Sequence, residues 1–497
     1  MLLKCFKRFL SNNFSESESA RPKLLGVTVS FSLLTILLIN TFAAAALDSS
    51  VVRDRAFSSS TVPPSTVGQF AAPLMGIRGS VGGDSAEALL KNVEGITTGV
   101  PYIRGANGES IVLTLNPDLQ LKAQELLRRY QVPWGAIVMV EPKTGRVLAL
   151  AGYSERDGAE ASVALRATFP AASLFKVITA AGGVERGGIS SDYIVNFRGG
   201  DHSFIGVSNG LPDPIRDRRR LSAAEALGRS CNPAFARIGV KFLSGGGLER
   251  YALNFGFNST MPFELPVGVS KFSPPTDELD LAKVSAGFGD VTVSPLHAAM
   301  IGAALGNKGV MMRPYMVERI VTPDGKSTNV NKPIPLRTVV APGTASEVMK
   351  MMETTVRTGT GRRQFLRGRG PVLLSRSIAA KTGTLKGDNP RGINHWFMAV
   401  APSEQPEVAL ATLVVDPGNA RVKSSALARV MLETYFGERS DDDTVIERSA
   451  PRKPSIKRKR RKAANVITAT KSRKSVSVNR LKLSGKKVSA KNSKDKK

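Results

Sequence analysis

Two residues near the middle of the chain have the types and the spacing of a nucleophile and its base. Ser173 and Lys176 are three positions apart within an apolar run, so on a helix they share a face, one turn apart. The lysine amine can then reach the serine hydroxyl and take its proton during attack on a carbonyl carbon. The pair is a candidate centre for acyl transfer, although a solvated helix face is the ordinary origin of such a spacing.

Two further polar motifs follow in chain order. Residues 230–232 read Ser-Cys-Asn, and residues 381–384 read Lys-Thr-Gly-Thr directly after an apolar stretch. The second motif is typical of an edge strand, with a cation, two hydroxyl groups and a glycine where a substrate backbone can lie close. Each motif alone could be a turn, a helix cap or a polar strand end. Their fixed order after Ser173 and Lys176 favours one shared site.

The order Ser-x-x-Lys, Ser-x-Asn and Lys-Thr-Gly is the signature of penicillin-binding proteins, and the chain resembles that family. Three further stretches agree with the resemblance: 135–152, the Gly-Phe-Gly at 287–289, and 394–402. The resemblance covers residues 110–437, which we expect to form the transpeptidase domain. It implies an α+β fold, in which an antiparallel β-sheet is covered by helices beside an all-helical subdomain.

The resemblance implies a role for each motif residue. Ser173 is the expected nucleophile, Lys176 its base, and Ser230 the relay that returns a proton to the leaving amine. Asn232 is the expected donor to a substrate amide carbonyl, and the backbone amides of Ser173 and Thr384 would form the oxyanion hole. The residues expected to bind the terminal carboxylate and the acyl chain are Lys381, Thr382, Gly383 and Thr384.

The base must be neutral to accept a proton. This requires that the pKa of Lys176 lie several units below its usual value of about 10.4. Apolar neighbours and a nearby Lys381 would both lower it, the first by desolvation and the second by repulsion. Cys231, between Ser230 and Asn232, is expected only to pack.

The implied activity is that of a peptidoglycan D,D-transpeptidase. A stem peptide that ends in D-Ala-D-Ala would acylate Ser173, and the acyl group would pass to an amine of a neighbouring stem; β-lactams would acylate the same serine. D,D-carboxypeptidases and β-lactamases share the constellation, but residues 249–254 are one residue too long for the deacylating motif of one β-lactamase class. An envelope-binding protein with an inert domain is the non-enzymatic alternative, and the intact motifs argue against it.

No organic cofactor or metal is expected. His202, His297 and His395 are far apart in sequence, and no His-Glu-x-x-His pattern or cysteine pair accompanies them. The glycine-rich residues 358–363 lack Gly-Lys-Ser or Gly-Lys-Thr and an obvious preceding strand. We therefore expect them to form a loop at the rim of the active site, not a phosphate-binding loop.

The N-terminal part predicts a membrane anchor. Residues 24–47 are 24 residues without a charge, and at about 1.5 Å per residue they can cross a hydrocarbon core of about 30 Å. Basic residues concentrate in 1–23, which the positive-inside rule places in the cytoplasm. We expect a single-pass protein of the inner membrane with its catalytic domain outside the cytoplasm. The alternative is a cleaved signal peptide, because four alanines lie near the end of the stretch.

The segments on either side of the catalytic domain differ from it in composition. Residues 48–109 are rich in Ser, Thr, Gly and Pro and are typical of a linker and pedestal. They leave room for neither a glycosyltransferase domain nor a sizeable non-catalytic module in full, so the resemblance is to a short, class B-like form. Only two cysteines, Cys5 and Cys231, are present, so no disulfide framework is expected.

Charge concentrates at the C-terminal end. The formal net charge is +29, and residues 451–497 contribute +18 of it, with 19 Lys or Arg against one acid. Few apolar residues and dense like charge predict that 438–497 are disordered. Nucleic acid is not expected as a partner because of the inferred topology. Anionic envelope polymers or lipid headgroups are the nearer candidates, and a merely solvated tail is the alternative.

The domain between linker and tail predicts strands at both ends with helices between them. A strand at 111–115 precedes a helix with Asn116 as its cap and Pro117 at its first position, and 136–152 predicts a β-hairpin. Further helices are expected around Ser173 and at 221–227, 232–242, 295–305, 344–356 and 424–436, and further strands at 378–384, 396–401 and 408–415. This order suits an antiparallel sheet covered by helices.

Overall fold

The computed structural model describes residues 93–438, except 98, 106, 156–160, 366–375 and 419. All of them belong to the first of two compact units, residues 1–450. The predicted cytoplasmic segment, the predicted membrane span and most of the predicted linker and tail lie outside the described residues. Within the described part of the chain, no helix has both the length and the apolar character needed to cross a membrane.

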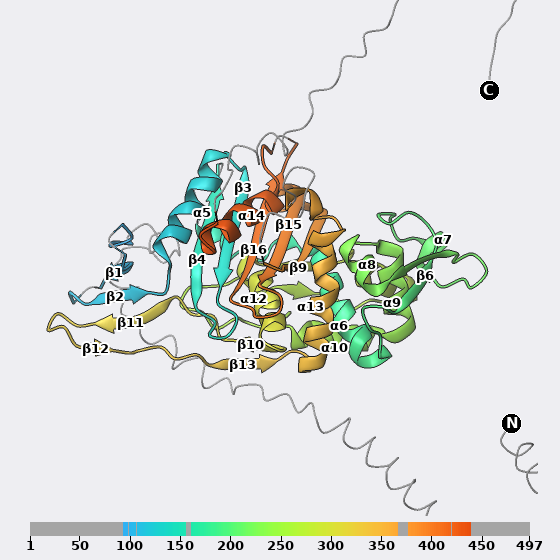
Figure 1. The fold of residues 1–497 in the computed structure, drawn as a ribbon, viewed down its shortest axis with the longest axis horizontal. Helices are drawn as coiled ribbons and strands as arrows, with labels where there is room; N and C mark the ends of the chain where they lie inside the picture. Colours follow the sequence, from blue (N-terminus) through green and yellow to red (C-terminus); the bar gives the residue numbers. More distant parts are fainter. Residues whose placement is uncertain are drawn as a thin grey trace, which may run out of the picture. The chain divides into compact units, whose positions relative to one another are not determined.

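A five-stranded antiparallel sheet forms the centre of the described domain (Figure 1). Its strand order is β14-β15-β16-β3-β4, so three strands from the end of the domain lie beside the early hairpin. The strands are β3 Trp134–Val140, β4 Val147–Ser154, β14 Ala379–Asp388, β15 Arg391–Ala401 and β16 Val408–Asp416. The predicted hairpin is confirmed, and β14 lies at the edge of the sheet, as the sequence predicts.

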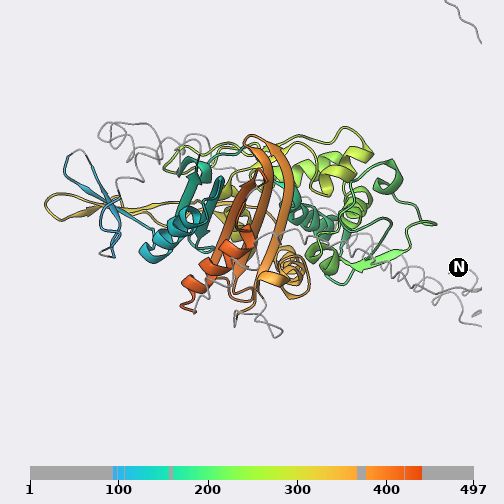
Figure 2. The same cartoon turned by 90° about the horizontal axis from the view of Figure 1, so that it is seen from above.

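Both faces of this sheet are buried, which explains why its strands are continuously apolar. In β3, Ala136 and Val138 belong to the core on one face, whereas Ile137 and Met139 belong to the core on the other. The second face is covered by α5 (Pro117–Arg129) and α14 (Ser424–Tyr435), which lie on the same side of the sheet in Figure 2. The first face packs against α12 (Pro295–Gly306).

Most of the remaining helices form a lobe next to the edge strand β14 (Figure 1). They are η2 Ala172–Phe175, α6 Lys176–Gly187, α7 Val207–Gly210, α8 Ala223–Gly228, α9 Asn232–Phe242, α10 Gly245–Asn254, α11 Glu278–Ser285 and α13 Pro342–Arg357. The lobe is not purely helical, because it also carries a two-stranded ribbon, β6 (Ile194–Phe197) with β7 (Arg219–Ser222).

Two helix starts show how local sequence sets these bounds. The predicted cap of α5 is confirmed, since Asn116 Oδ1 accepts a hydrogen bond from Leu119 N at 3.1 Å. The helix predicted at 221–227 begins two residues late, at Ala223. The reason is that Ser222 ends β7 and caps α8, in a capping box with Glu225.

Short elements complete the domain. β1 lies within the range predicted as linker and pedestal, where it pairs with β2. The remaining elements are β1 Tyr102–Arg104, β2 Ser110–Leu113, β5 Phe169–Pro170, β8 Lys271–Phe272, β9 Val291–Val293, β10 Val310–Met312, β11 Val317–Val321, β12 Ser327–Thr328, β13 Pro335–Thr338, η1 Ala161–Ala164 and η3 Arg362–Gln364.

Candidate active site

The serine and lysine of the first motif lie at the junction of η2 and α6. Ser173 lies in η2, a short 3-10 helix, and Lys176 is the first residue of α6. The pair therefore does not lie on one regular α-helix. The spacing nevertheless brings them together, because Lys176 Nζ lies 2.8 Å from Ser173 Oγ. Ala172, just before the serine, has a φ of 52°, a left-handed conformation that costs energy in any residue with a Cβ.

Gly287 permits this backbone conformation. A methyl group on Gly287 would lie 2.4 Å from the carbonyl oxygen of Ala172 and 3.0 Å from Cα of Ser173. A side chain at this position would therefore displace the turn that carries the serine. The glycine of the Gly-Phe-Gly sequence thus has a physical role in positioning Ser173.

Lys176 is completely buried among three oxygen acceptors. Its Nζ donates to Ser173 Oγ and to Asn232 Oδ1, both at 2.8 Å, and to the carbonyl oxygen of Ala286. Burial lowers the pKa of Lys176 to about 7, against a smaller opposing effect of Cys231. Near neutral pH a large share of this amine is therefore unprotonated, as a general base requires.

The second motif spans the turn before α9. Ser230 has a φ of 55°, and its Oγ accepts a hydrogen bond from Lys381 Nζ at 2.8 Å. Asn232 is the first residue of α9, and its side chain bridges Lys176 and the carbonyl oxygen of Ser203, to which Nδ2 donates at 3.1 Å. Cys231 is buried, and burial raises the pKa of its thiol to about 11, so the thiol stays protonated.

Lys381 is a second fully buried lysine, on the edge strand β14. Its Nζ donates to Ser230 Oγ and to the carbonyl oxygen of Thr382, both at 2.8 Å. Burial, and then the charge of Lys176, hold the pKa of Lys381 well below its usual value. The charge of Lys176 thus disfavours the charged form of Lys381, whereas the pKa of Lys176 is lowered by burial.

Gly383 packs tightly against Trp396, its partner on β15, and is in ordinary contact with the turn that carries Ser173. A methyl group on Gly383 would lie 3.1 Å from Cβ of Trp396 and 3.5 Å from Cβ of Ala172. The strand alternation turns Thr382 and Thr384 to the opposite side from Gly383, and Thr384 is exposed. The two hydroxyls of the motif are therefore more accessible than its lysine.

A loop between β6 and β7 forms hydrogen bonds with Asn232. The backbone N of Asn232 donates to the carbonyl oxygen of Asp201 at 2.6 Å, in addition to the side-chain bond to Ser203. The Asp201 carboxylate accepts from Arg219 Nη2 at 2.9 Å and from Arg229 Nε at 2.8 Å. Ionic contacts thus connect this loop to β7 and to the residue before Ser230.

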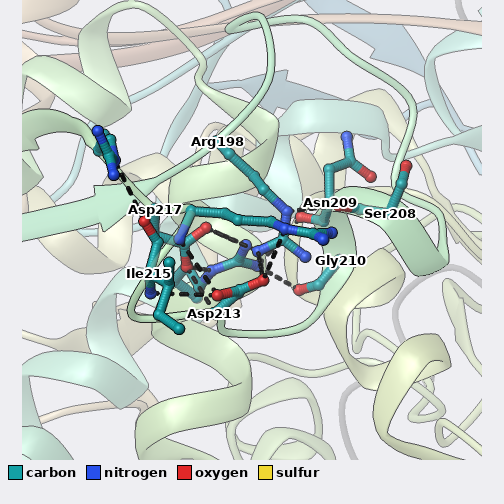
Figure 3. Close-up of polar contacts among 10 residues, drawn as sticks. Arg198, Ser208, Asn209, Gly210, Asp213, Ile215 and Asp217 are labelled. Atoms are coloured by element: carbon teal, nitrogen blue, oxygen red, sulfur yellow. Dashed lines mark hydrogen bonds and ion pairs between the residues drawn. The ribbon is translucent and has the colours of Figure 1, made fainter.

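A buried ionic network fixes the rest of the same loop on α9 (Figure 3). Arg237 of α9 donates to both carboxylate oxygens of Asp217, at 2.7 and 2.9 Å, and Arg198 Nη1 donates to the same carboxylate at 2.8 Å. Arg237 Nη1 also donates to the carbonyl oxygens of Asn209 and Gly210. Burial pushes the pKa of Asp217 up, but the hydrogen bonds from the two arginines and the backbone outweigh it and leave the pKa lowered.

The structure gathers the residues of all three motifs in one place. Hydrogen bonds connect Ser173, Lys176 and Asn232 in one group and Ser230, Lys381 and Thr382 in another, and Gly383 and Thr384 continue β14 beside them. Within the described residues, no group of three or more His, Cys, Asp or Glu is placed to hold a metal ion.

Sequence reasoning missed two kinds of participant. The carbonyl oxygens of Ala286, Asp201 and Ser203 are backbone atoms, which every residue type has, so the sequence gives no signal for them. Thr360 is different, because it lies in the glycine-rich segment that the sequence analysis placed at the rim. Its Oγ1 lies 2.6 Å from Oγ1 of Thr382.

Comparison with known proteins agrees with this geometry. The family model described as penicillin binding protein transpeptidase domain matches residues 135–433, more than half of the chain. The chain is 29% identical over 346 residues to the peptidoglycan D,D-transpeptidase PbpA of Mycobacterium tuberculosis, an alignment that covers 63% of this chain and 68% of the relative.

Two solved structures are similar as well. Penicillin-binding protein A from M. tuberculosis, in an imipenem acyl-enzyme complex, has a TM-score of 0.57 and 27% identity, over 66% of this chain and 80% of that chain. The D,D-transpeptidase domain of a peptidoglycan glycosyltransferase from Eggerthella lenta has a TM-score of 0.56 and 26% identity, over 66% of this chain and 83% of that chain. The chain therefore belongs to the family of penicillin-binding protein transpeptidase domains.

Proposed function

We propose that the protein is a peptidoglycan D,D-transpeptidase. Stem peptides ending in D-Ala-D-Ala acylate Ser173 and are then cross-linked to a neighbouring stem, and β-lactams acylate the same serine. The observation that carries this proposal is the fully buried Lys176, whose amine has a pKa near 7 and lies 2.8 Å from Ser173 Oγ. The relative PbpA, named a peptidoglycan D,D-transpeptidase, and an acyl-enzyme complex of penicillin-binding protein A support it.

The acylation step follows from the two hydrogen-bonded groups. Ser173 Oγ forms a bond to the carbonyl carbon of the penultimate D-alanine while its proton passes to Lys176 Nζ. Collapse of the tetrahedral intermediate breaks the bond to the nitrogen of the last D-alanine. That nitrogen receives the proton from Lys176 by way of Ser230 Oγ, which already accepts a hydrogen bond from Lys381 Nζ. The products are free D-alanine and an ester on Ser173.

The transfer step reverses these roles. An amine of a second stem peptide attacks the ester carbonyl and passes its proton back through Ser230 Oγ to Lys176, which gives it to the leaving Ser173 Oγ. The Asn232 amide bonds the substrate backbone, and the hydroxyls of Thr382 and Thr384 hold the terminal carboxylate together with Lys381. A β-lactam follows only the first half, because the cleaved ring nitrogen stays attached to the acyl group.

Fluorescent penicillin tests the site. The wild-type protein should be labelled covalently, and mass spectrometry of the digested protein should place the adduct on Ser173. Ser173→Ala removes the nucleophile with little change in volume and should abolish labelling, whereas Cys231→Ala, at a buried thiol, should keep it. Equal labelling of Ser173→Ala and wild type would refute the assignment.

The fate of the acyl-enzyme distinguishes the related activities. We expect the penicilloyl adduct to persist for many minutes after excess β-lactam is removed, and a disaccharide-peptide substrate to give dimers linked through the D-alanine carbonyl. Rapid loss of the adduct with multiple turnover would instead indicate a β-lactamase. Release of D-alanine without cross-linked product, with a suitable acceptor present, would indicate a carboxypeptidase.

We further propose that residues 24–47 anchor the protein in the inner membrane with 1–23 in the cytoplasm. The support is the uncharged length of this segment and the basic residues before it. A thiol reagent that does not cross membranes tests the topology. It should label Cys5 only after lysis, and labelling of Cys5 in intact spheroplasts would reverse the proposed orientation.

The basic residues 451–497 are proposed to bind anionic envelope polymers or lipid headgroups. Their charge of +18 supports an electrostatic attachment that salt would weaken. Deleting them should leave acylation of Ser173 unchanged and reduce salt-sensitive sedimentation with such material. Unchanged sedimentation of the truncated protein would leave the segment without this role.

A further inference from the structure

The glycine-rich segment after α13 is ordered by its own backbone. The N–H groups of Thr358 and Gly359 donate to the carbonyl oxygen of Thr354 at 3.0 and 2.7 Å. Gly361 N donates to the carbonyl oxygen of Thr355 at 2.9 Å. The segment therefore satisfies carbonyls at the end of α13, and its path is fixed.

Two facing glycines bring this segment against the second motif. A methyl group on Gly359 would lie 2.0 Å from the carbonyl oxygen of Gly228, and one on Gly228 would lie 2.3 Å from Thr354 Oγ1. With hydrogen at both positions, Thr360 N can donate to the Gly228 carbonyl at 3.0 Å. Because Gly228 is two residues before Ser230, Thr360 is held beside the site by main-chain contacts.

The side chain of Thr360 contacts the third motif. Its Oγ1 lies 2.6 Å from Thr382 Oγ1 and 3.3 Å from the carbonyl oxygen of Gly228. Each hydroxyl has one proton to donate. If the Thr360 hydroxyl donates to the Gly228 carbonyl, the contact between the two threonines requires the Thr382 hydroxyl to donate its only proton to Thr360. If Thr360 donates to Thr382, the Thr382 proton stays free.

The second arrangement costs little and suits an anionic ligand. The Gly228 carbonyl already accepts the backbone N–H of Thr360, so withdrawing the hydroxyl proton leaves no carbonyl unpaired. A carboxylate accepts hydrogen bonds and donates none, so it can bind Thr382 only through that free proton. Two hydroxyls in series, both donating toward the anion, also polarise each other favourably.

We propose that Thr360 is a positioning residue for carboxylate recognition. Its hydroxyl donates to Thr382 Oγ1 and thereby directs the Thr382 proton to the terminal carboxylate of the acyl donor. This inference rests on the proposed function, to which it adds a residue beside the Lys-Thr-Gly strand. Thr360 acts through Thr382, and its backbone contacts hold it in place for that purpose.

The test removes the hydroxyl and keeps the shape. Thr360→Val retains the backbone N–H bond to Gly228, and Thr360→Ser is the matched control that restores the hydroxyl. In the full-length protein, the second-order rate constant for acylation of Ser173 by penicillin G should fall about tenfold in Thr360→Val, because a hydrogen bond to a charged group is weakened. The serine variant should be within about twofold of wild type.

Two comparisons separate positioning from a general structural effect. The slower reaction with penicillin G methyl ester, followed by mass spectrometry, should change less than about twofold in Thr360→Val, because the ester has no carboxylate to recognise. In a Thr382→Val background, Thr360→Val should not lower the acylation rate constant further, because the Thr382 hydroxyl through which Thr360 acts is already absent.

When the wild type is labelled, three results would overturn the proposal. An equal loss with acid and ester would mean that Thr360 only supports the fold of the site. An undiminished loss in the Thr382→Val background would mean that Thr360 acts independently of Thr382. Unchanged acylation by penicillin G in Thr360→Val would mean that Thr360 has no role in carboxylate recognition. In each of these three cases the proposed function would still stand, because Ser173 is labelled. Absence of any labelling of wild type would refute both.

Discussion

Two clusters of largely buried cations lie near α9, and they differ in their partners. Arg198 and Arg237 share the carboxylate of Asp217, at 2.8 and 2.7 Å. Lys176 and Lys381 bond hydroxyl, amide and carbonyl oxygens instead. Within the described part of the chain, neither lysine amine has an ion pair with a carboxylate.

This difference decides what each cluster can do. An arginine remains charged when buried, so it needs a carboxylate, and the resulting network fixes the loop between β6 and β7. A lysine without a carboxylate can lose its proton, and burial lowers the pKa of Lys176 to about 7 and that of Lys381 below its usual value. The paired cluster is therefore suited to holding the fold, and the unpaired cluster contains the proposed base, Lys176.

The largest expected effect comes from giving the unpaired cluster a permanent charge. Lys176→Arg places at this position a group that cannot be deprotonated in this pH range. Acylation of Ser173 by fluorescent penicillin should fall about 10²- to 10⁴-fold, the usual contribution of a general base. Stopped-flow or quenched gel measurements of the rate test this.

Lys176→Met is the matched control, because it has similar length and no charge. It should also lose acylation, but its melting temperature should be at least as high as that of wild type, since no amine is buried. Near-normal acylation by either folded variant would exclude Lys176 as the base.

The paired cluster should respond in the opposite way. Asp217→Asn leaves Arg237 without its carboxylate and leaves Arg198 only a longer contact to Asp213, at 3.9 Å. Loss of one partner of a buried pair costs about 3–5 kcal/mol of unfolding free energy. Urea unfolding at constant pH measures the loss. A variant as stable as wild type would show that the network contributes little to the fold and would weaken the comparison.

The sequence predicted the central sheet and the motif residues because both depend on local patterns. Apolar runs gave the hairpin and β14 to β16, and Asn116 and Pro117 gave the start of α5. The eight predicted site residues come from three short motifs. The structure places six of them in two neighbouring hydrogen-bonded groups, with Gly383 and Thr384 continuing β14 beside them.

The parts that sequence could not supply depend on the tertiary structure. Ribbon β6–β7 consists of four-residue strands that become stable only through packing, and Ser222 belongs to both a strand and a helix cap. The pairing of Asp217 with Arg237 joins positions 20 apart, with β7 and α8 between them and no periodic signal. Thr360 and Thr382 meet only because Gly228 and Gly359 let two segments approach.

Changing the pH should alter the rate of acylation less than the substitutions at Lys176 do. The pH midpoint should depend on the lysine cluster and not on the arginine cluster. The rate should rise with pH through a midpoint near 7, because the neutral amine of Lys176 is the base. In the folded protein at low temperature, Asp217→Asn should keep this midpoint, since Asp217 does not contact the lysine. A pH-independent rate between pH 5 and 9 in wild type would contradict a titrating base.

The same pKa implies a dependence of stability on pH. The pKa of Lys176 in the folded state, about 7, is below the unfolded value of 10.5, so between these values the unfolded chain binds more protons. The contribution of this lysine to unfolding free energy therefore rises from about pH 7 to pH 10.5 and is lost as pH falls through 7. The difference between wild type and Lys176→Met, measured by urea unfolding, should show this sign.

The smallest expected effect concerns Asp201, which is intermediate between the two clusters. Its carboxylate binds Arg219 and Arg229, whose side chains are each 45% exposed, so solvent and salt screen the pairs. Asp201→Asn should change the unfolding free energy by no more than about 1 kcal/mol, well below the effect of Asp217→Asn. Because the Asn232 N–H bonds the backbone carbonyl of Asp201, which the substitution keeps, acylation should fall only a few-fold. Added salt should reduce the difference in unfolding free energy between Asp201→Asn and wild type. A loss of unfolding free energy as large as that of Asp217→Asn would mean that solvent exposure does not distinguish the two carboxylates.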